Sequence, residues 1–152
     1  MPTGSENSKE QRMEESLLRV ELTERLHAIQ SYENVSVLTN FQKKNIEHDL
    51  PACQQLMSDL CAWLVLKEWR DAQGKKTWIF GPLLALDELW HVFIIHTQDY
   101  HKFCEHYFGY YVHHTVELVG AEHVMTPDEL ADFLDDALES LGTDWVLRYF
   151  RL

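Results

Sequence analysis

The sequence has no long hydrophobic run, and it is poor in glycine, proline and cysteine. Its longest uninterrupted apolar stretch, residues 60–66, is far shorter than the roughly 20 residues that a membrane-spanning helix needs. The first ten residues are polar and contain no apolar signal core, so we expect neither a signal peptide nor insertion into a membrane. With 152 residues, 45% of them hydrophobic, the chain is long enough to fold as one domain without disulfides or a structural metal.

The three cysteines include no C-x-x-C pair. Cys53 and Cys61 lie about 12 Å apart along one expected helix, which is too far for a disulfide. We therefore predict reduced thiols in a cytoplasmic protein, each of them buried as a small apolar residue.

Basic residues are also scarce: the chain has 13 Lys and Arg residues and 25 Asp and Glu residues. The formal charge of -12 repels phosphate backbones and anionic lipid, so we expect no nucleic-acid or membrane partner. Residues 115–144 contain no Lys or Arg at all. One face of an expected helix there carries Asp132, Asp135, Asp136 and Glu139, which form either a solvated face or a docking surface for a partner with a basic surface.

Helical periodicity dominates the chain. No glycine or proline interrupts residues 52–73, where apolar residues leave almost no polar face, so this segment is expected to be the core helix. Asp49 and Pro51 are expected to start this core helix, as N-cap and first-turn proline. Further helices are expected over 10–30, over 83–108 with Gly109 as its C-terminal cap, and over 126–141 with a capping box of Thr126 and Glu129. A shorter helix is expected over 36–47, where 35–39 could instead be extended. The fold class predicted is all-α: a single compact bundle of about five helices with a short aromatic C-terminal segment. Residues 1–9 are expected to be a disordered tail and 10–152 a single helical domain.

Seven of the nine histidines lie between His91 and His123. His91 follows Asp87 by four residues, which allows a carboxylate–imidazole hydrogen bond on one helix face. Glu88 and His91 have the E-x-x-H spacing with which helical metalloproteins present two ligands. A single zinc or iron ion bound by His91, by Asp87 or Glu88 and by His114 is one hypothesis, and a structural His–Asp pair without metal is the other.

A shared site requires a break in the expected helix over 83–108. A straight helix places Gly109 about 27 Å from His91, and the five residues that follow span at most roughly 17 Å. We expect a break near Thr97, whose hydroxyl can cap a new helix with Asp99 in its first turn. Folding back there would bring His114 toward His91.

Helical-wheel positions place Trp90, Tyr100 and Cys104 on the buried side, together with Thr97. A reactive thiolate needs an electropositive and accessible surrounding, so a nucleophilic role for Cys104 is disfavoured. The sequence contains neither a glycine-rich phosphate loop nor a nucleophile elbow.

The pattern D-x-x-W-H, T-x-x-Y-x-x-F-C, F-G and H-H over residues 83–115 resembles a family of small, uncharacterised bacterial proteins. It is more loosely similar to glycine-rich-domain-containing proteins. The resemblance implies no activity, but it does imply one connected site made of Asp87, Trp90, His91, Tyr100, Cys104, His113 and His114.

Two functions therefore remain open at the level of sequence. The first is a cytoplasmic accessory or interaction protein with a histidine-rich polar centre. The alternative is a mononuclear zinc- or iron-dependent enzyme, or a metal-binding protein, that uses His91 and His114.

Overall fold

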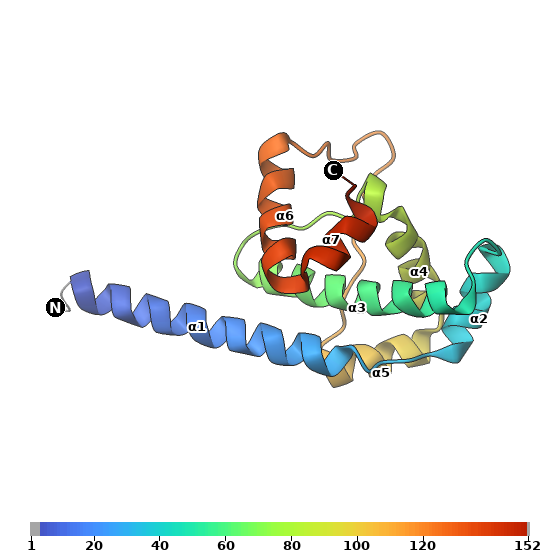
Figure 1. Cartoon of the computed structure of the whole chain (residues 1–152), viewed down its shortest axis with the longest axis horizontal. Helices are drawn as coiled ribbons and strands as arrows, with labels where there is room; N and C mark the ends of the chain where they lie inside the picture. Colours follow the sequence, from blue (N-terminus) through green and yellow to red (C-terminus); the bar gives the residue numbers. More distant parts are fainter. Residues whose placement is uncertain (1–3, 152) are drawn as a thin grey trace.

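The computed structural model describes residues 4–151, whose regular secondary structure is entirely helical (Figure 1). The helices are α1 (Gly4–Ile29), α2 (Val35–Lys44), α3 (Leu50–Ala72), the short 3-10 helix η1 (Gly81–Leu83), α4 (Leu84–Ile95), α5 (Thr97–Tyr107), α6 (Pro127–Leu141) and α7 (Thr143–Tyr149). The predicted all-α bundle is confirmed, with seven α-helices in the described range in place of about five. The expected helix over 83–108 is divided in two, and the aromatic C-terminal segment is itself helical.

Helix α3 is the centre of the bundle, as its apolar run predicts. It packs against α1, α2, α4 and α6, and its central residues Leu60, Trp63 and Leu64 are essentially inaccessible to solvent. Asp49 caps its first turn through the backbone N–H of Ala52, at 2.9 Å. Of the helices described in residues 4–151, none is long and apolar enough to cross a bilayer.

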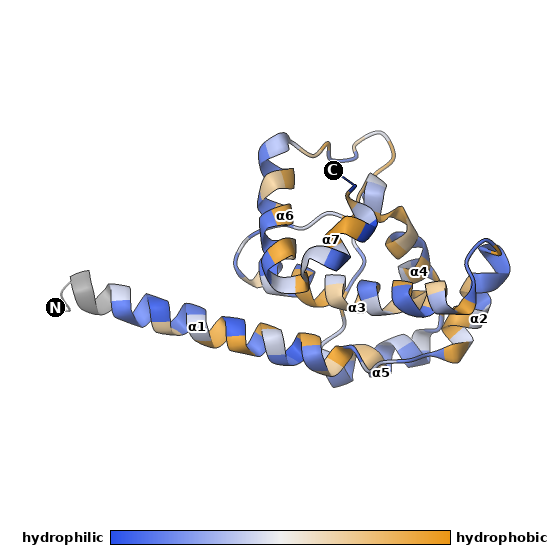
Figure 2. Ribbon diagram, in the orientation of Figure 1, coloured by the Kyte–Doolittle hydropathy of each residue, from blue (hydrophilic) through white to orange (hydrophobic). Residues whose placement is uncertain are grey.

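Helix α1 reaches into the segment that the sequence indicates as a disordered tail. It begins at Gly4, and the Arg12 side chain hydrogen-bonds both the Ser8 carbonyl and hydroxyl oxygens, at 3.2 and 3.0 Å. Residues 1–3 of that expected tail lie outside the described residues. Only the C-terminal half of α1 packs on the body, through Leu22 and Ile29, and the other half extends away from it (Figures 1 and 2).

Residues 35–39 belong to a helix, so the extended alternative for this stretch is wrong. Asn34 explains the result, because its side chain accepts a hydrogen bond from the backbone N–H of Val37 and caps α2. The same side chain donates to Asp99 on α5, at 3.1 Å. The cap therefore also ties the start of α2 to the first turn of α5.

The break expected near Thr97 is present, but its capping chemistry differs from the prediction. Thr97 is exposed and makes no capping hydrogen bond, and the residue between α4 and α5 is His96. One ring nitrogen of His96 lies 2.9 Å from the Val92 carbonyl oxygen, and the other lies 2.8 Å from the Asn40 side chain. The imidazole thus holds the end of α4 against α2, and His96 itself is the residue that separates α4 from α5.

The C-terminal helices are joined to α3 through one buried carboxylate. Asp59 accepts hydrogen bonds from the Arg148 guanidinium at 2.6 and 2.8 Å and from the Tyr149 hydroxyl at 2.6 Å. Trp145 donates to the backbone carbonyl of the same residue. This cluster fixes α7 on the central helix.

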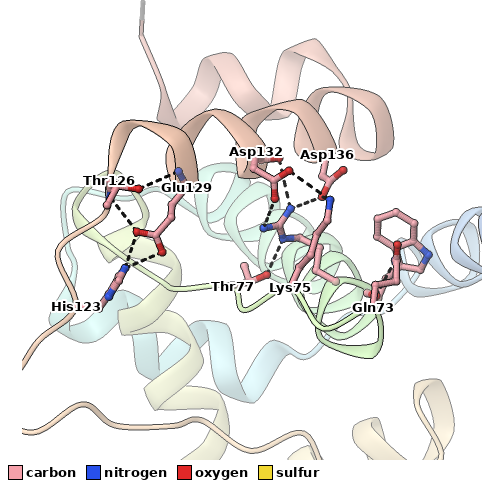
Figure 3. A network of polar contacts seen from close by, with 10 residues as sticks. Gln73, Lys75, Thr77, His123, Thr126, Glu129, Asp132 and Asp136 are labelled. Carbon is pink, nitrogen blue, oxygen red and sulfur yellow. Dashed lines mark hydrogen bonds and ion pairs between the residues drawn. The ribbon is translucent and has the colours of Figure 1, made fainter.

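Three of the four acidic residues predicted on one face of α6 form ion pairs inside the chain, and Figure 3 shows two of them, Asp132 and Asp136. The Arg70 guanidinium, which is almost completely buried, pairs with Asp136 and with Asp132, the latter at 3.2 Å, and Lys75 also reaches both carboxylates. Glu139 pairs with Arg19 of α1 at 2.7 Å, and Asp135 is exposed. The expectation of a uniformly solvated face is therefore wrong for Asp136, because the C-terminal end of α3 supplies an unforeseen buried cation.

Candidate functional site

Asp87 and His114 form the centre of the site. His114 Nε2 lies 2.6 Å from Asp87 Oδ1, although 27 residues separate the two in sequence. His91, the partner expected from the i,i+4 spacing, lies farther away, with its Nδ1 atom 3.7 Å from Asp87 Oδ2. The imidazole that hydrogen-bonds Asp87 is therefore that of His114.

Aromatic stacking fixes the plane of the His114 ring. It stacks on Trp90 with a centroid distance of 4.1 Å and on His91 with a centroid distance of 4.6 Å. The His114 side chain is only 11% exposed, whereas that of His91 is 53% exposed. The group therefore lies at the boundary between core and solvent.

A chain of hydrogen bonds explains how His114 returns to α4. Gly109, at a φ of 77°, ends α5 as its position in the sequence predicts, and it reverses the chain. Trp90 Nε1 then donates to the Tyr100 hydroxyl at 3.1 Å, and this hydroxyl donates to the Val112 carbonyl oxygen. The Val112 N–H in turn points to Cys104 Sγ at 3.5 Å. The backbone N–H and carbonyl groups of Val112, two residues before His114, are thus both hydrogen-bonded to buried side chains.

Tyr100 and Cys104 have a positioning role in this arrangement. Burial raises the pKa of the Tyr100 phenol well above its ordinary value, so the hydroxyl stays protonated and can donate to Val112. Burial also raises the pKa of the Cys104 thiol, against the opposing effect of the Val112 N–H. A protonated, buried thiol is neither a nucleophile nor a metal ligand, in agreement with the sequence-based expectation for Cys104.

Three of the predicted residues are arranged so that they can hold a metal ion. Asp87, His91 and His114 each offer one ligand atom, and all three atoms lie within 4.8 Å of one another. Glu88, the alternative carboxylate, is exposed on α4 and is not in this group. His113 is also outside it, and its ring lies near that of Tyr111 at 4.7 Å. Five of the seven candidate residues are therefore connected by direct contacts, whereas Cys104 is joined to them through Val112 and His113 through Tyr111.

The group opens into a cleft of about 330 Å³. This cleft lies between α3, α4, the connector over residues 73–80 and the loop over residues 108–126. We call it the histidine cleft. Its walls include Trp63 and Lys67 of α3, Lys76 and Trp78 of the connector, and Val116 of the loop. Sequence reasoning missed this cleft, because the connector carries no recognisable motif and its aromatic residues are typical of ordinary packing.

A second histidine is held in the same way near the other end of the loop. His123 stacks on Trp78 with a centroid distance of 3.9 Å, and its Nε2 atom lies 2.9 Å from both carboxylate oxygens of Glu129 (Figure 3). Glu129 also completes the capping box with Thr126 at the start of α6, as the sequence predicts. Each end of the loop is therefore anchored by an imidazole that contacts one tryptophan and one carboxylate.

The fold and the site together define an all-α protein whose half-buried carboxylate–histidine group opens into an aromatic cleft. The chain belongs to the UCP032817-like family, an uncharacterised family whose model matches residues 24–129. This match is wider than the expected resemblance over 83–115, since it includes α2, α3 and the whole loop before α6. No curated protein and no solved structure matches the chain.

Proposed function

We propose that the protein binds one divalent transition-metal ion, zinc or iron, through Asp87, His91 and His114. The observation that carries this proposal is the convergence of the three ligand atoms within 4.8 Å, contributed by α4 and by a loop distant in sequence. Two atoms each about 2.1 Å from a tetrahedral zinc ion lie roughly 3.4 Å apart. The two separations from the Asp87 oxygens, 2.6 and 3.7 Å, bracket that value.

The surroundings of His114 support a cation at its Nε2 atom. The other ring nitrogen, Nδ1, lies 3.3 Å from the Thr115 carbonyl oxygen, which can only accept a hydrogen bond. Metal-binding histidines commonly donate their second ring N–H to a carbonyl in this way. His114 Nε2 and the Asp87 carboxylate share a hydrogen bond at 2.6 Å, and a metal ion would replace its proton, with the two ligand atoms moving apart.

The ligand number indicates a catalytic kind of centre. Structural zinc sites usually have four protein ligands, whereas catalytic sites have three and leave a position for water or a substrate. Two histidines and one carboxylate with open positions are also the ligand set of non-haem iron(II) enzymes. Asp87, His91 and His114 all line the histidine cleft, so we infer that a substrate of such a centre would bind there.

Metal content is the direct test. Protein purified without an affinity tag should contain zinc or iron close to one equivalent, measured by inductively coupled plasma mass spectrometry. His114→Ala and Asp87→Asn should each abolish this stoichiometry. His101→Ala is the matched control, because His101 is exposed on α5 and lies outside the group.

Dialysis of the metal-free protein against zinc distinguishes a metal site from a structural pair of Asp87 and His114. If the metal-free protein takes up no zinc at micromolar concentrations, Asp87 and His114 form a structural pair and the proposal is wrong. Equal zinc uptake by the wild type and by His114→Ala would also overturn it.

A second proposed function is that of an accessory protein that docks a basic partner through α6. Asp135 supports it, because this carboxylate is exposed on that helix and forms no ion pair within residues 4–151, whereas Glu139 is exposed but pairs with Arg19. Asp132 and Asp136 contribute less, since Arg70 and Lys75 already neutralise them. Salt-dependent binding of a basic peptide that is weakened by Asp135→Asn, but not by Asp71→Asn on α3, would favour this function.

The cytoplasmic location predicted from the cysteines stays a prediction, and all three thiols are buried and free.

A further inference from the structure

The histidine cleft is large enough for a small organic molecule. Its volume of about 330 Å³ lies at the lower end of the range typical of ligand sites, roughly 300–1,000 Å³. The proposed metal ligands lie on one wall, and Lys76 and Trp78 of the connector lie on another. A ligand in this space would contact both.

The apolar walls of the cleft are mainly indole rings. Trp63, Trp78 and Trp90 all line it, and Trp63 and Trp90 pack edge to face with a centroid distance of 5.5 Å. The indole nitrogens of Trp63 and Trp78 are buried and have no hydrogen-bond partner among the described residues. Flat aromatic walls favour a ligand with an apolar body.

The carboxylates that line the cleft are already engaged. Asp71 accepts from Lys67 at 2.8 Å, and Glu117 accepts from the backbone N–H of His123 at 3.1 Å. Asp87 is paired with His114 and would hold the metal. Asp71 and Asp87 are therefore each paired with a side chain of the protein, whereas Glu117 is bonded only to a backbone N–H group.

Lys76, in contrast, has a free positive charge. Its side chain is exposed and lies over the Trp78 ring, with Nζ 5.6 Å from the centroid, and it forms no ion pair within residues 4–151. Lys67, the other cation of the wall, is bound to both Glu68 and Asp71. A divalent metal with one carboxylate ligand adds a further net positive charge. Lys76 is thus the one lysine of the cleft wall that has no carboxylate partner among the described residues.

From this arrangement we propose that the histidine cleft binds a small organic carboxylate, with its carboxylate paired to Lys76 and its apolar body against the tryptophans. The inference rests on the proposed metal site for the polar end of the cleft. A monoanion matches the single free lysine, and the indole walls distinguish an organic carboxylate from inorganic phosphate.

Cyclohexanecarboxylate is a suitable probe, because it does not absorb where tryptophan is excited. Its binding to zinc-loaded protein should change the tryptophan fluorescence, and the neutral analogue cyclohexanemethanol should bind about tenfold more weakly. Lys76→Gln should weaken binding of the carboxylate by about tenfold and leave binding of the alcohol unchanged. Lys43→Gln, on the exposed end of α2, is the control and should bind the carboxylate as the wild type does.

Three results would overturn the inference: equal binding of the alcohol, equal binding of inorganic phosphate in a competition titration, or no effect of Lys76→Gln. The metal-free protein keeps the inference separate from the proposed function. If zinc binds but Lys76 is without effect, the ligand assignment fails and the metal site stands. If zinc does not bind but the carboxylate still binds through Lys76, the metal site fails and the anion site stands.

Discussion

The hydroxyl of Tyr100 donates a hydrogen bond to the carbonyl oxygen of Val112, twelve residues farther along the chain. Tyr100 is completely buried on α5, whereas Val112 belongs to the irregular segment that leads to His114. The bond therefore ties the loop to the core immediately before the residue that pairs with Asp87.

Tyr100→Phe should consequently weaken metal binding without changing any metal ligand. It removes the hydrogen bond to Val112 and leaves Trp90 Nε1 without its acceptor. We expect the zinc affinity to fall by about tenfold or more, as is typical when an outer-shell partner is lost. The unfolding free energy should fall by about 1–3 kcal/mol. Zinc affinity is measured by competition with a chromophoric chelator, and stability by urea unfolding.

Tyr111→Phe is the control for that experiment. The Tyr111 ring packs edge to face on Tyr100 at 5.2 Å, yet its hydroxyl forms no hydrogen bond within the described part of the chain. It should bind zinc as the wild type does. An unchanged zinc affinity in Tyr100→Phe would show that the loop positions His114 by other means.

Trp90→Ala should be among the most destabilising substitutions in the site. The side chain is 1% exposed, contacts Trp63 and His114, and donates to Tyr100. Truncating a buried tryptophan leaves a large cavity, so we expect a loss of about 3–5 kcal/mol in urea unfolding. A loss below 1 kcal/mol would contradict its placement in the core.

Two carboxylates of α6, one paired and one exposed, allow a matched comparison. Asp136→Asn leaves the buried Arg70 guanidinium with a weakened counter-charge, and we expect it to cost about 3 kcal/mol of unfolding free energy. Asp135→Asn changes an exposed carboxylate on the same helix and should cost less than about 0.5 kcal/mol. Similar urea midpoints for the two variants would mean that the ion pair between Arg70 and Asp136 adds little to the unfolding free energy.

Acid pH should destabilise the protein partly through Asp132. Burial acts to raise its pKa, but hydrogen bonds and charges from Lys75 and Arg70 hold it below the ordinary value of 3.8. A carboxyl whose pKa is lower in the folded state stabilises the protein above its unfolded value. That contribution is lost as the pH falls through the lower folded value. Between pH 5 and pH 3, Asp132→Asn should therefore lose less unfolding free energy than the wild type, and Asp135→Asn should follow the wild type.

Local sequence signals predicted most of the helical framework. Asp49 before Pro51 and the Thr126–Glu129 capping box mark helix starts that the structure confirms. The absence of glycine and proline from 52–73 gave the correct core helix. Chain-length arithmetic showed that a shared site requires a break in the helix over 83–108, and the expected position near Thr97 is correct although Thr97 forms no cap. The cause of that break was not predictable, because the Val92 carbonyl and the Asn40 side chain meet His96 only in the folded chain.

The sequence by itself determined which residues could take part in the site, and tertiary structure decided which of them meet. The i,i+4 spacing predicted His91 as the partner of Asp87, because residues four apart share a helix face. The closer partner is His114, because hydrogen bonds from Tyr100 and to Cys104 bring the loop back onto α4. The cleft beside it likewise depends on how the connector after α3 packs. Helical periodicity acts over a few residues, whereas the return of a loop depends on contacts between segments distant in sequence, which no local pattern encodes.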